Sequence, residues 1–157
     1  MRRIRVYVDT SVFGGMHDEE FAEPTGRFFR QVQEGRFLVL VSTLSVDELN
    51  GAPECVTDVL RQLLPEQVEP VALTEEVREL AEEYVRAGVL SQKYADDAVH
   101  VAAATVAGAE LIVSWNFRHI VHFQKIPLYN AMNTLRGYQQ IAIFSPREVI
   151  HYEDQEV

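Results

Sequence analysis

Short apolar stretches recur along the chain and predict strands. Residues 4–8 place apolar side chains in alternation, and residues 37–41 are continuously apolar, a pattern typical of a strand buried on both faces of a sheet. Weaker stretches predict three more strands, at residues 67–73, 110–114 and 140–144. Pro70 assigns the first of these three to a sheet edge, because proline cannot donate a ladder hydrogen bond.

Between these stretches, apolar positions recur with the period of helices. Phe28 and Phe29 mark a helix at residues 24–33, and Thr74 is the expected N-cap of another. The inward face of that second helix consists of Val77, Leu80, Ala81 and Tyr84. Further helices are predicted at residues 44–50, 54–64, 95–107 and 128–136, with a last helical turn at 146–150.

Strands that alternate with helices predict an α/β fold, a parallel sheet of about five strands with helices on both faces. After the first strand we expect turns at residues 9–11 and 13–15, the second made flexible by Gly14 and Gly15. The length of 157 residues suits one domain. We expect residues 1–150 to form it and residues 151–157 to be an acidic tail.

Composition removes several classes of protein. Cys55 is the single cysteine, so a disulfide scaffold is excluded, and no cysteine pair for zinc is present. The sequence shows neither a signal peptide nor an apolar run long enough for a membrane span, which predicts a soluble, cytoplasmic protein without a membrane partner. The net charge of −10 argues against a general nucleic-acid coat.

Candidate chemistry gathers where the predicted strands end. Ligands of open parallel sheets bind beyond the carboxyl ends of the strands. Asp9 follows the first strand and Asn116 follows the strand at 110–114, so both point to the same rim. Glu48 and Asp97 lie on predicted helices that begin near this rim. Gathered carboxylates repel one another, and a hard cation such as Mg²⁺ or Mn²⁺ relieves that repulsion and suits phosphodiester hydrolysis.

Each of these residues also has a purely structural interpretation. Asp9 would cap the turn that follows it, and Asn116 would form an Asx turn or be the N-cap of the segment that follows it. Glu48 would complete a capping box that begins at Ser45. Asp96 and Asp97 would be first-turn acids favoured by the helix dipole.

The helical period separates the last two acids. Asp97 shares a face with Val101 and Ala104 and is therefore tilted toward the sheet, whereas Asp96 lies about 100° around the helix. An acid on a sheet-facing stripe is costly unless it is paired or binds a cation. This favours Asp97 as a member of a site.

Four motifs, in this order, resemble those of the PIN domain family. They are Tyr7-Val8-Asp9-Thr10-Ser11-Val12, Ser45-Val46-Asp47-Glu48-Leu49, Asp97-Ala98-Val99-His100-Val101-Ala102 and Leu111-Ile112-Val113-Ser114-Trp115-Asn116-Phe117. The closing Ile143-Phe144-Ser145-Pro146-Arg147-Glu148 resembles that family's last strand and its proline-containing turn. Each motif is short, but together they span nearly the whole chain.

The resemblance implies a VapC-like ribonuclease, the toxin of a type II toxin–antitoxin pair, with Mg²⁺ or Mn²⁺ in an acidic pocket. The three acidic positions that are most regular in the family are matched here by Asp9, Glu48 and Asp97. Asp96 precedes the last of them and would be a helper only. Asn116 stands where the family often has a fourth acid. Its amide can coordinate a cation or orient water, but it brings no charge.

The same resemblance, with metal chemistry, implies roles for these residues. Asp9 and Asp97 would ligate the ion, and Glu48 would ligate it or hold a water, for hydrolysis to 5′-phosphate and 3′-hydroxyl products. Thr10 or Ser11 would orient a carboxylate. The implied partners are an RNA substrate, a cognate antitoxin protein and a second copy of the chain in a homodimer.

Several residues keep two interpretations. Bases or phosphates of a nucleic acid would be bound by Trp115, Phe117, Arg118 and His119. Core packing also explains Trp115 and Phe117. His100 has no partner at zinc spacing and is interpreted as a satisfied helix histidine. An interface or the core would explain three further apolar residues, Phe28, Phe29 and Leu60.

The main alternative function is a catalytically weak PIN-fold module that binds RNA or protein, which Asn116 and the acidic charge keep open. Metal-dependent hydrolysis that is lost in Asp97→Asn would exclude it. A haloacid-dehalogenase-type phosphatase needs a second aspartate where Ser11 stands. A response-regulator receiver needs an acidic pair at the first strand and a lysine near the last, which neither Lys93 nor Lys125 supplies.

Overall fold

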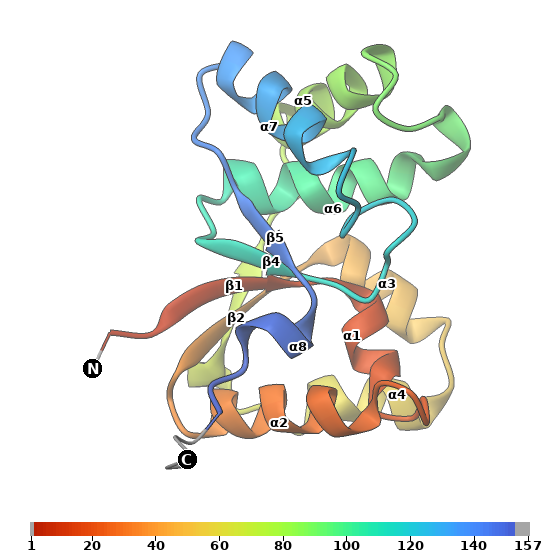
Figure 1. Cartoon of the computed structure of the whole chain (residues 1–157). Helices are drawn as coiled ribbons and strands as arrows, with labels where there is room; N and C mark the ends of the chain where they lie inside the picture. The colour runs from red at the N-terminus through yellow and green to blue at the C-terminus, as the bar shows by residue number, and fades with distance from the viewer. Residues whose placement is uncertain (1, 153–157) are drawn as a thin grey trace.

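A five-stranded parallel sheet forms the centre of the structure, a computed structural model that describes residues 2–152 (Figure 1). The strands are β1 (Ile4–Val8), β2 (Phe37–Ser42), β3 (Val68–Val71), β4 (Leu111–Val113) and β5 (Ala142–Phe144). Their order in the sheet is β3-β2-β1-β4-β5, and every pairing is parallel. The predicted α/β class is confirmed, as is the edge position of the strand that contains Pro70.

Helices cover both faces of this sheet (Figure 1). They are α1 (Thr10–Gly15), α2 (Ala22–Gln33), α3 (Thr43–Asn50), α4 (Glu54–Arg61), α5 (Glu75–Arg86), α6 (Ala95–Val106), α7 (Ile126–Leu135) and α8 (Pro146–Val149), with 3-10 turns η1 (Pro65–Gln67) and η2 (Gln92–Tyr94). Thr74 caps α5 as predicted, by accepting a hydrogen bond from Val77 N. Within residues 2–152, no helix is long and apolar enough to cross a membrane. Of the predicted acidic tail at 151–157, residues 153–157 lie outside the described residues.

The turns predicted directly after β1 are wrong, because Thr10–Gly15 forms helix α1. Gly15 is a packing residue rather than a flexible one. A Cβ at this position would lie 2.7 Å from Thr25 Oγ1 and 2.7 Å from Trp115 Nε1. Glycine therefore allows α1 to approach α2 and the indole closely, a requirement that resembles a loop signal in the sequence.

The register of the strands divides the core into two clusters, one on each face. Tyr7 pairs with Leu40 and Ile112, and Ile112 pairs with Ile143, so these four side chains share the face covered by α5, α6 and α7 (Figure 1). The other face is built from Val6, Val8, Val39 and Val113. Side chains of successive strand residues alternate between the faces, which explains why Tyr7 lies opposite its two valine neighbours.

The second core, on the face of α1, α2 and α8, contains the aromatic pair of α2. Phe28 and Phe29 are 0% and 6% exposed, and Leu60 packs against the same cluster. Burial of each phenyl ring contributes about 1.5–3 kcal/mol to the free energy of unfolding. Core packing therefore explains all three residues, and the interface interpretation of Phe28 and Phe29 is wrong.

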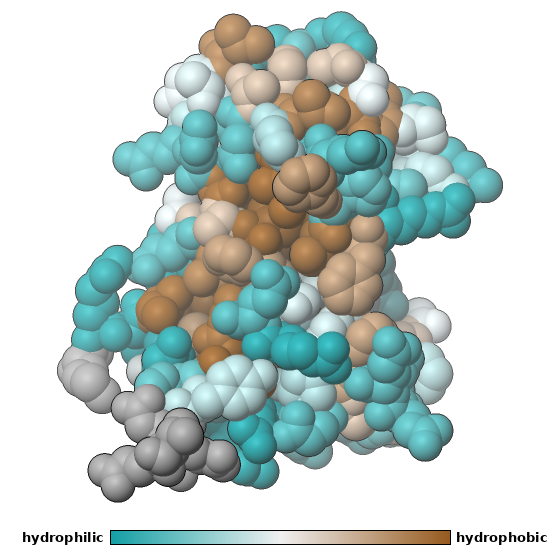
Figure 2. Space-filling view, in the orientation of Figure 1, coloured by the Kyte–Doolittle hydropathy of each residue, from teal (hydrophilic) through white to brown (hydrophobic). Residues whose placement is uncertain are grey.

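Hydrophobic residues also gather on the surface, across the middle of the face shown in Figure 2, beside β5 and below α7. The exposed large hydrophobic residues from the end of β4 to β5 are Phe117, Phe123, Leu128, Leu135 and Phe144. We refer to these five residues as the exposed apolar set. Phe123 is 89% exposed, which is unusual for an aromatic side chain in a monomeric protein.

The sheet order places a topological switch point between β1 and β4. From β1 the chain adds β2 and β3 on one side, and it then returns to add β4 and β5 on the other. In open α/β sheets, the crevice at the carboxyl ends of the strands at such a point is where ligands bind. Asp9 directly follows β1, and Ser114 directly follows β4.

Candidate active site

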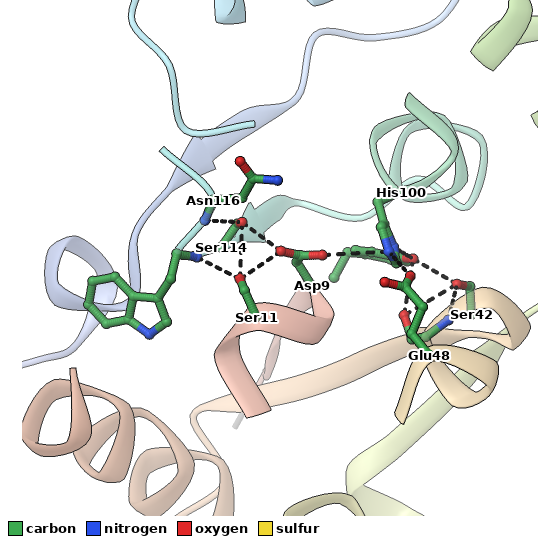
Figure 3. Close-up of polar contacts among 10 residues, drawn as sticks. Asp9, Ser11, Ser42, Glu48, His100, Ser114 and Asn116 are labelled. Carbon is green, nitrogen blue, oxygen red and sulfur yellow. Dashed lines mark hydrogen bonds and ion pairs between the residues drawn. The ribbon is translucent and has the colours of Figure 1, made fainter. Parts of the chain in front are cut away.

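Asp9 is the buried centre of the polar groups at this switch point, with 4% of its surface exposed. Its Oδ2 accepts hydrogen bonds from Ser11 Oγ at 2.7 Å and from Ser114 Oγ at 2.8 Å (Figure 3). Asp9 is the N-cap residue of α1 by position, but its side chain makes no capping bond in the described chain. The interpretation of this carboxylate as a turn cap is therefore wrong.

The two serines connect Asp9 to the backbone that follows β4. Ser11 Oγ accepts from Trp115 N at 2.9 Å, and Ser114 Oγ accepts from Asn116 N at 2.9 Å. The sequence indicated Ser11 as an orienting hydroxyl, whereas the contribution of Ser114 was missed. Its position at the end of β4 was the available signal, because that strand ends beside β1.

Asp97 approaches the same place from the first turn of α6. It is partly buried, whereas Asp96 is exposed, as the helical period predicted. Burial raises the pKa of Asp97, and the charges of Asp9 and Glu48 raise it further, against the opposing effects of a hydrogen bond with Asn116 and of His100. The structure therefore brings Asp9, Glu48, Asp97 and Asn116 together, and like charges repel one another there.

Glu48 lies in α3 and is held by a histidine. The predicted capping box at Ser45 is wrong, because α3 starts at Thr43 and its N-cap is Ser42, whose Oγ accepts from Ser45 N. Glu48 is thus in the second turn of the helix rather than at its start. Its Oε1 accepts a hydrogen bond from His100 Nε2 at 2.5 Å (Figure 3).

Both ring nitrogens of His100 are hydrogen-bonded, as its interpretation as a satisfied histidine predicts, but sequence reasoning missed that its partners belong to the site. Its ring lies between two carboxylates, with Nε2 3.6 Å from Asp9 Oδ1, and Nδ1 is 2.7 Å from the Tyr7 hydroxyl. Burial works to lower the pKa of His100, but the contacts with Tyr7, Glu48 and Asp9 outweigh it and raise the pKa well above its ordinary value. A signal existed, because His100 and Asp97 are three residues apart and share a helix face.

The side chain of Asn116 fixes the segment that follows it and acts on Asp97. Its Oδ1 accepts from His119 N, three residues further on, at 3.0 Å, as the interpretation of Asn116 as an N-cap of that segment requires. Hydrogen bonding from Asn116 also works to lower the pKa of the Asp97 carboxyl. The amide thus stabilises charged Asp97 where a fourth acid would repel it.

The aromatic residues after β4 divide into buried and exposed ones. Trp115 is 7% exposed, stacks on Phe21 and donates from Nε1 to Thr25 Oγ1 at 2.9 Å, so it belongs to the core. Phe117 is 48% exposed, and Arg118 is also exposed. Core packing therefore explains Trp115 but leaves Phe117 open to a ligand.

The donor set suits a hard divalent cation. Asp9 and Asp97 offer carboxylate oxygens, and their mutual repulsion is what a cation would relieve. Among residues 2–152, no three His, Cys, Asp or Glu side chains lie close enough to hold a metal ion by themselves. Mg²⁺ is commonly bound through one or two carboxylates and keeps several waters, so these two aspartates fit such an ion.

Comparison with known families agrees with this geometry. Residues 6–121 match the model of a family described as PIN domain. This match includes all the acids described above and ends before α7. No curated protein matches the sequence.

Solved structures with the same fold have low sequence identity to this chain. The sarcin–ricin loop cleaving toxin VapC20 of Mycobacterium tuberculosis is 15% identical, with a TM-score of 0.56 over 87% of this chain and 98% of its own. FitAcB from Neisseria gonorrhoeae is 14% identical, with a TM-score of 0.56 over 90% and 97%. VapBC2 from Rickettsia felis, bound to a DNA fragment from their promoter, is 11% identical, with a TM-score of 0.55 over 89% and 97%.

Proposed function

The chain belongs to the PIN domain family, and on this premise we propose that it is a ribonuclease dependent on Mg²⁺ or Mn²⁺ and the toxin of a toxin–antitoxin pair. The observation that carries the proposal is the meeting of Asp9 and Asp97 at the switch point. Burial and, after it, repulsion by Asp9 raise the pKa of Asp97, and Asn116 and His100 oppose this rise in part. Uncompensated negative charge at a ligand-binding crevice favours a cation there.

Each acid has a separate part in the proposed reaction. Asp9, fixed by two serine hydroxyls, and Asp97 would hold the ion, while Glu48 would ligate it or hold a water bound to it. A bound divalent ion supplies positive charge to the phosphoryl oxygens and lowers the pKa of water. Asn116 works to lower the pKa of Asp97 and so favours the charged form, which binds a cation. Asp96, which precedes Asp97 and is exposed on α6, would be a helper only.

The substrate proposed is single-stranded RNA that enters beside Phe117 and Arg118. An exposed aromatic ring stacks on bases, and a guanidinium attracts phosphate. Both residues follow Asn116 directly, so a base bound there would be near the acids. The net charge of −10 means that such local contacts, rather than the whole surface, would hold the RNA.

The proposed protein partners are an antitoxin and a second copy of this chain. The structure of FitAB bound to a DNA fragment is similar in fold to this chain, with 15% sequence identity and a TM-score of 0.56 between the two. The exposed apolar set supplies surface of the kind that protein partners cover (Figure 2). A partner that buries Phe123 would remove the most exposed aromatic ring in this set from water.

A PIN-fold module that binds RNA without cleaving it remains the second candidate. The observation that favours it is Asn116, an amide where the family often has a fourth acid. A site with one charge fewer binds a cation less tightly, which would slow hydrolysis without preventing RNA contacts.

The test is cleavage of a labelled single-stranded RNA with and without Mn²⁺, with Asp9→Asn as the site variant. Asp47→Asn is the matched control, because Asp47 is an exposed acid on α3 beside Glu48. We expect cleavage that needs Mn²⁺, disappears in Asp9→Asn and persists in Asp47→Asn. RNA binding without cleavage would favour the second candidate, and a wild-type protein that binds no Mn²⁺ would contradict the proposed enzyme.

A further inference from the structure

His100 contacts two of the acids with a single ring nitrogen. Nε2 is 2.5 Å from Glu48 Oε1 and 3.6 Å from Asp9 Oδ1. A charged carboxylate can only accept hydrogen bonds, so Nε2 carries a proton and donates it to Glu48. The ring itself is buried, with 1% of its surface exposed.

The other nitrogen fixes the direction of the ring. Nδ1 is 2.7 Å from the Tyr7 hydroxyl, which in turn is 2.8 Å from Ser42 Oγ. Ser42 is the N-cap of α3, the helix that carries Glu48. The contacts therefore form a closed path from the start of α3 through Tyr7 and His100 to Glu48, and the ring is held at both ends.

Glu48 needs this restraint more than the aspartates do. Its side chain is 36% exposed, whereas that of Asp9 is 5% exposed and fixed by two hydroxyls. A long, half-exposed side chain populates several rotamers unless a partner selects one. Apart from His100, no side chain in the described part of the chain hydrogen-bonds the Glu48 carboxylate.

We infer that His100 is a positioning residue of the proposed nuclease site, which holds the Glu48 carboxylate beside Asp9 through Nε2. The inference rests on the proposed function and deepens it, since it assigns a role to a residue outside the acidic set. Partners that orient the groups around a metal typically change metal affinity or activity about 10–100-fold when they are removed. A histidine that only filled the core would affect stability without selecting a position for Glu48.

Two substitutions distinguish a histidine that positions Glu48 from one that only fills space in the core. In His100→Gln, the amide nitrogen can replace Nε2 and donate to Glu48, whereas in His100→Asn the shorter amide can replace Nδ1 and reach only the Tyr7 side. We expect His100→Asn to weaken Mn²⁺ binding about 10-fold and to lower kcat about 10–100-fold. We expect His100→Gln to restore most of both.

Mn²⁺ binding is read without RNA, from the electron paramagnetic resonance signal of free Mn²⁺, and kcat and KM are measured separately on labelled RNA. Tyr7→Phe removes the support of His100 and should give a smaller loss than His100→Asn. Tyr84→Phe is the matched control, because Tyr84 is also fully buried and hydrogen-bonded but contacts none of the acids. It should leave Mn²⁺ affinity unchanged, and circular dichroism melts confirm that each variant is folded.

Two results would overturn the inference while leaving the proposed function intact. One is wild-type Mn²⁺ affinity and kcat in both His100 variants. The other is equal losses in both variants that follow their melting temperatures. A wild-type protein that binds no Mn²⁺ would instead refute the proposed function, and the inference would be refuted with it.

Discussion

Two polar clusters in the same chain, each containing a buried tyrosine, are built in opposite ways. The acidic cluster lies at the carboxyl ends of the strands and consists of Asp9, Glu48, Asp97, His100 and Tyr7. Figure 3 shows Asp9, Glu48 and His100 of this cluster. The asparagine cluster lies among α5, α6 and α7 and consists of Tyr84, Thr105, Asn130 and Asn133. Each contains one fully buried tyrosine whose hydroxyl bonds to a polar side chain.

The asparagine cluster is neutral and closed. Tyr84 donates to Asn133 Oδ1, and Asn133 Nδ2 donates to Asn130 Oδ1 at 3.2 Å. Asn130 then completes its bonds on the main chain, since Oδ1 accepts from Ile141 N at 2.7 Å and Nδ2 donates to Ile141 O at 3.0 Å. Burial raises the pKa of Tyr84, so this hydroxyl stays neutral. Such a network stabilises the packing of α7 against α5 and against the segment that leads into β5, and it needs no ligand.

The acidic cluster is satisfied in hydrogen bonds but not in charge. Asp9 and Glu48 both accept hydrogen bonds, yet the pKa of Asp97 is still raised, first by burial and then by its negative neighbours. The difference teaches that hydrogen-bond satisfaction and charge balance are separate requirements. A buried cluster that meets the first and not the second is a candidate for binding a cation.

The largest effect expected from this comparison is on activity. Asp97→Asn removes one of the two carboxylates proposed to hold the ion, and we expect RNA cleavage to fall by at least about 100-fold. A substitution in the asparagine cluster, Tyr84→Phe, should leave kcat within about twofold, because distant sites act independently. Single-turnover cleavage of labelled RNA at saturating Mn²⁺ measures both, and a comparable loss in the two variants would contradict the division of roles.

The second effect is on stability. Asn133→Ala leaves Tyr84, Asn130 and Thr105 without their shared partner, and we expect the free energy of unfolding to fall by about 1–3 kcal/mol. Mn²⁺ affinity should not change. Urea unfolding followed by circular dichroism measures the loss, and a wild-type midpoint would show that the closed network contributes little.

The third effect is a gain in stability, whereas substitution of a hydrogen-bonded buried polar residue usually lowers the free energy of unfolding. Asp97→Asn should stabilise the metal-free protein by about 1 kcal/mol, raising Tm by about 2–4 °C, because it removes the repulsion with Asp9. Saturating Mn²⁺ should reverse the order, since wild-type protein then gains about 2.7 kcal/mol at 100 times the Kd. A lower Tm for metal-free Asp97→Asn at neutral pH would contradict this account.

The pH dependence of that difference follows from the raised pKa of Asp97. Folded Asp97 binds its proton more tightly than the unfolded chain does, in which the pKa is near 3.8. The free energy of unfolding therefore falls as the pH rises from the unfolded pKa to the folded pKa. Above the folded pKa, the stability difference between Asp97→Asn and wild type has its largest value. It should disappear as pH falls toward 3.8, which Tm measurements across this range would record.

The smallest effect concerns the amide in place of a fourth acid. Asn116→Asp keeps an oxygen for His119 N but loses the hydrogen bond that stabilises charged Asp97. We expect the metal-free protein to lose about 0.5–1 kcal/mol and Mn²⁺ affinity to rise a few-fold. Calorimetric Mn²⁺ titration measures the second change, and weaker binding would show that Asn116 itself is a ligand.

Local patterns were enough to predict most of the fold. The five strands and the helix that starts after Thr74 follow from hydrophobic period and capping, which depend on near neighbours. α1 was missed because Gly14 and Gly15 resemble a turn, whereas Gly15 is required by Trp115, one hundred residues away in sequence. Glu48 resembled a cap because Ser45 precedes it by three residues, although the helix begins at Thr43.

The sequence predicted the acids of the candidate site but not the residues that hold those acids in place. Asp9, Glu48, Asp97 and Asn116 follow strand ends or helix starts, so topology alone predicts that they meet. His100 depends on contacts with Tyr7 and Glu48, which are 93 and 52 positions distant. Local hydrophobic patterns carry no information on contacts between residues so far apart in sequence. Such contacts become visible only in the folded structure.

The single tryptophan gives the site an optical reporter of its own. Trp115 is shielded from water, and its backbone nitrogen bonds to the same Ser11 hydroxyl that donates to Asp9. We therefore expect a blue-shifted emission maximum, and one serine connects Asp9 to the backbone of this tryptophan. Occupancy at the carboxyl ends of the strands can thus be followed by intrinsic fluorescence, with no label added to the chain.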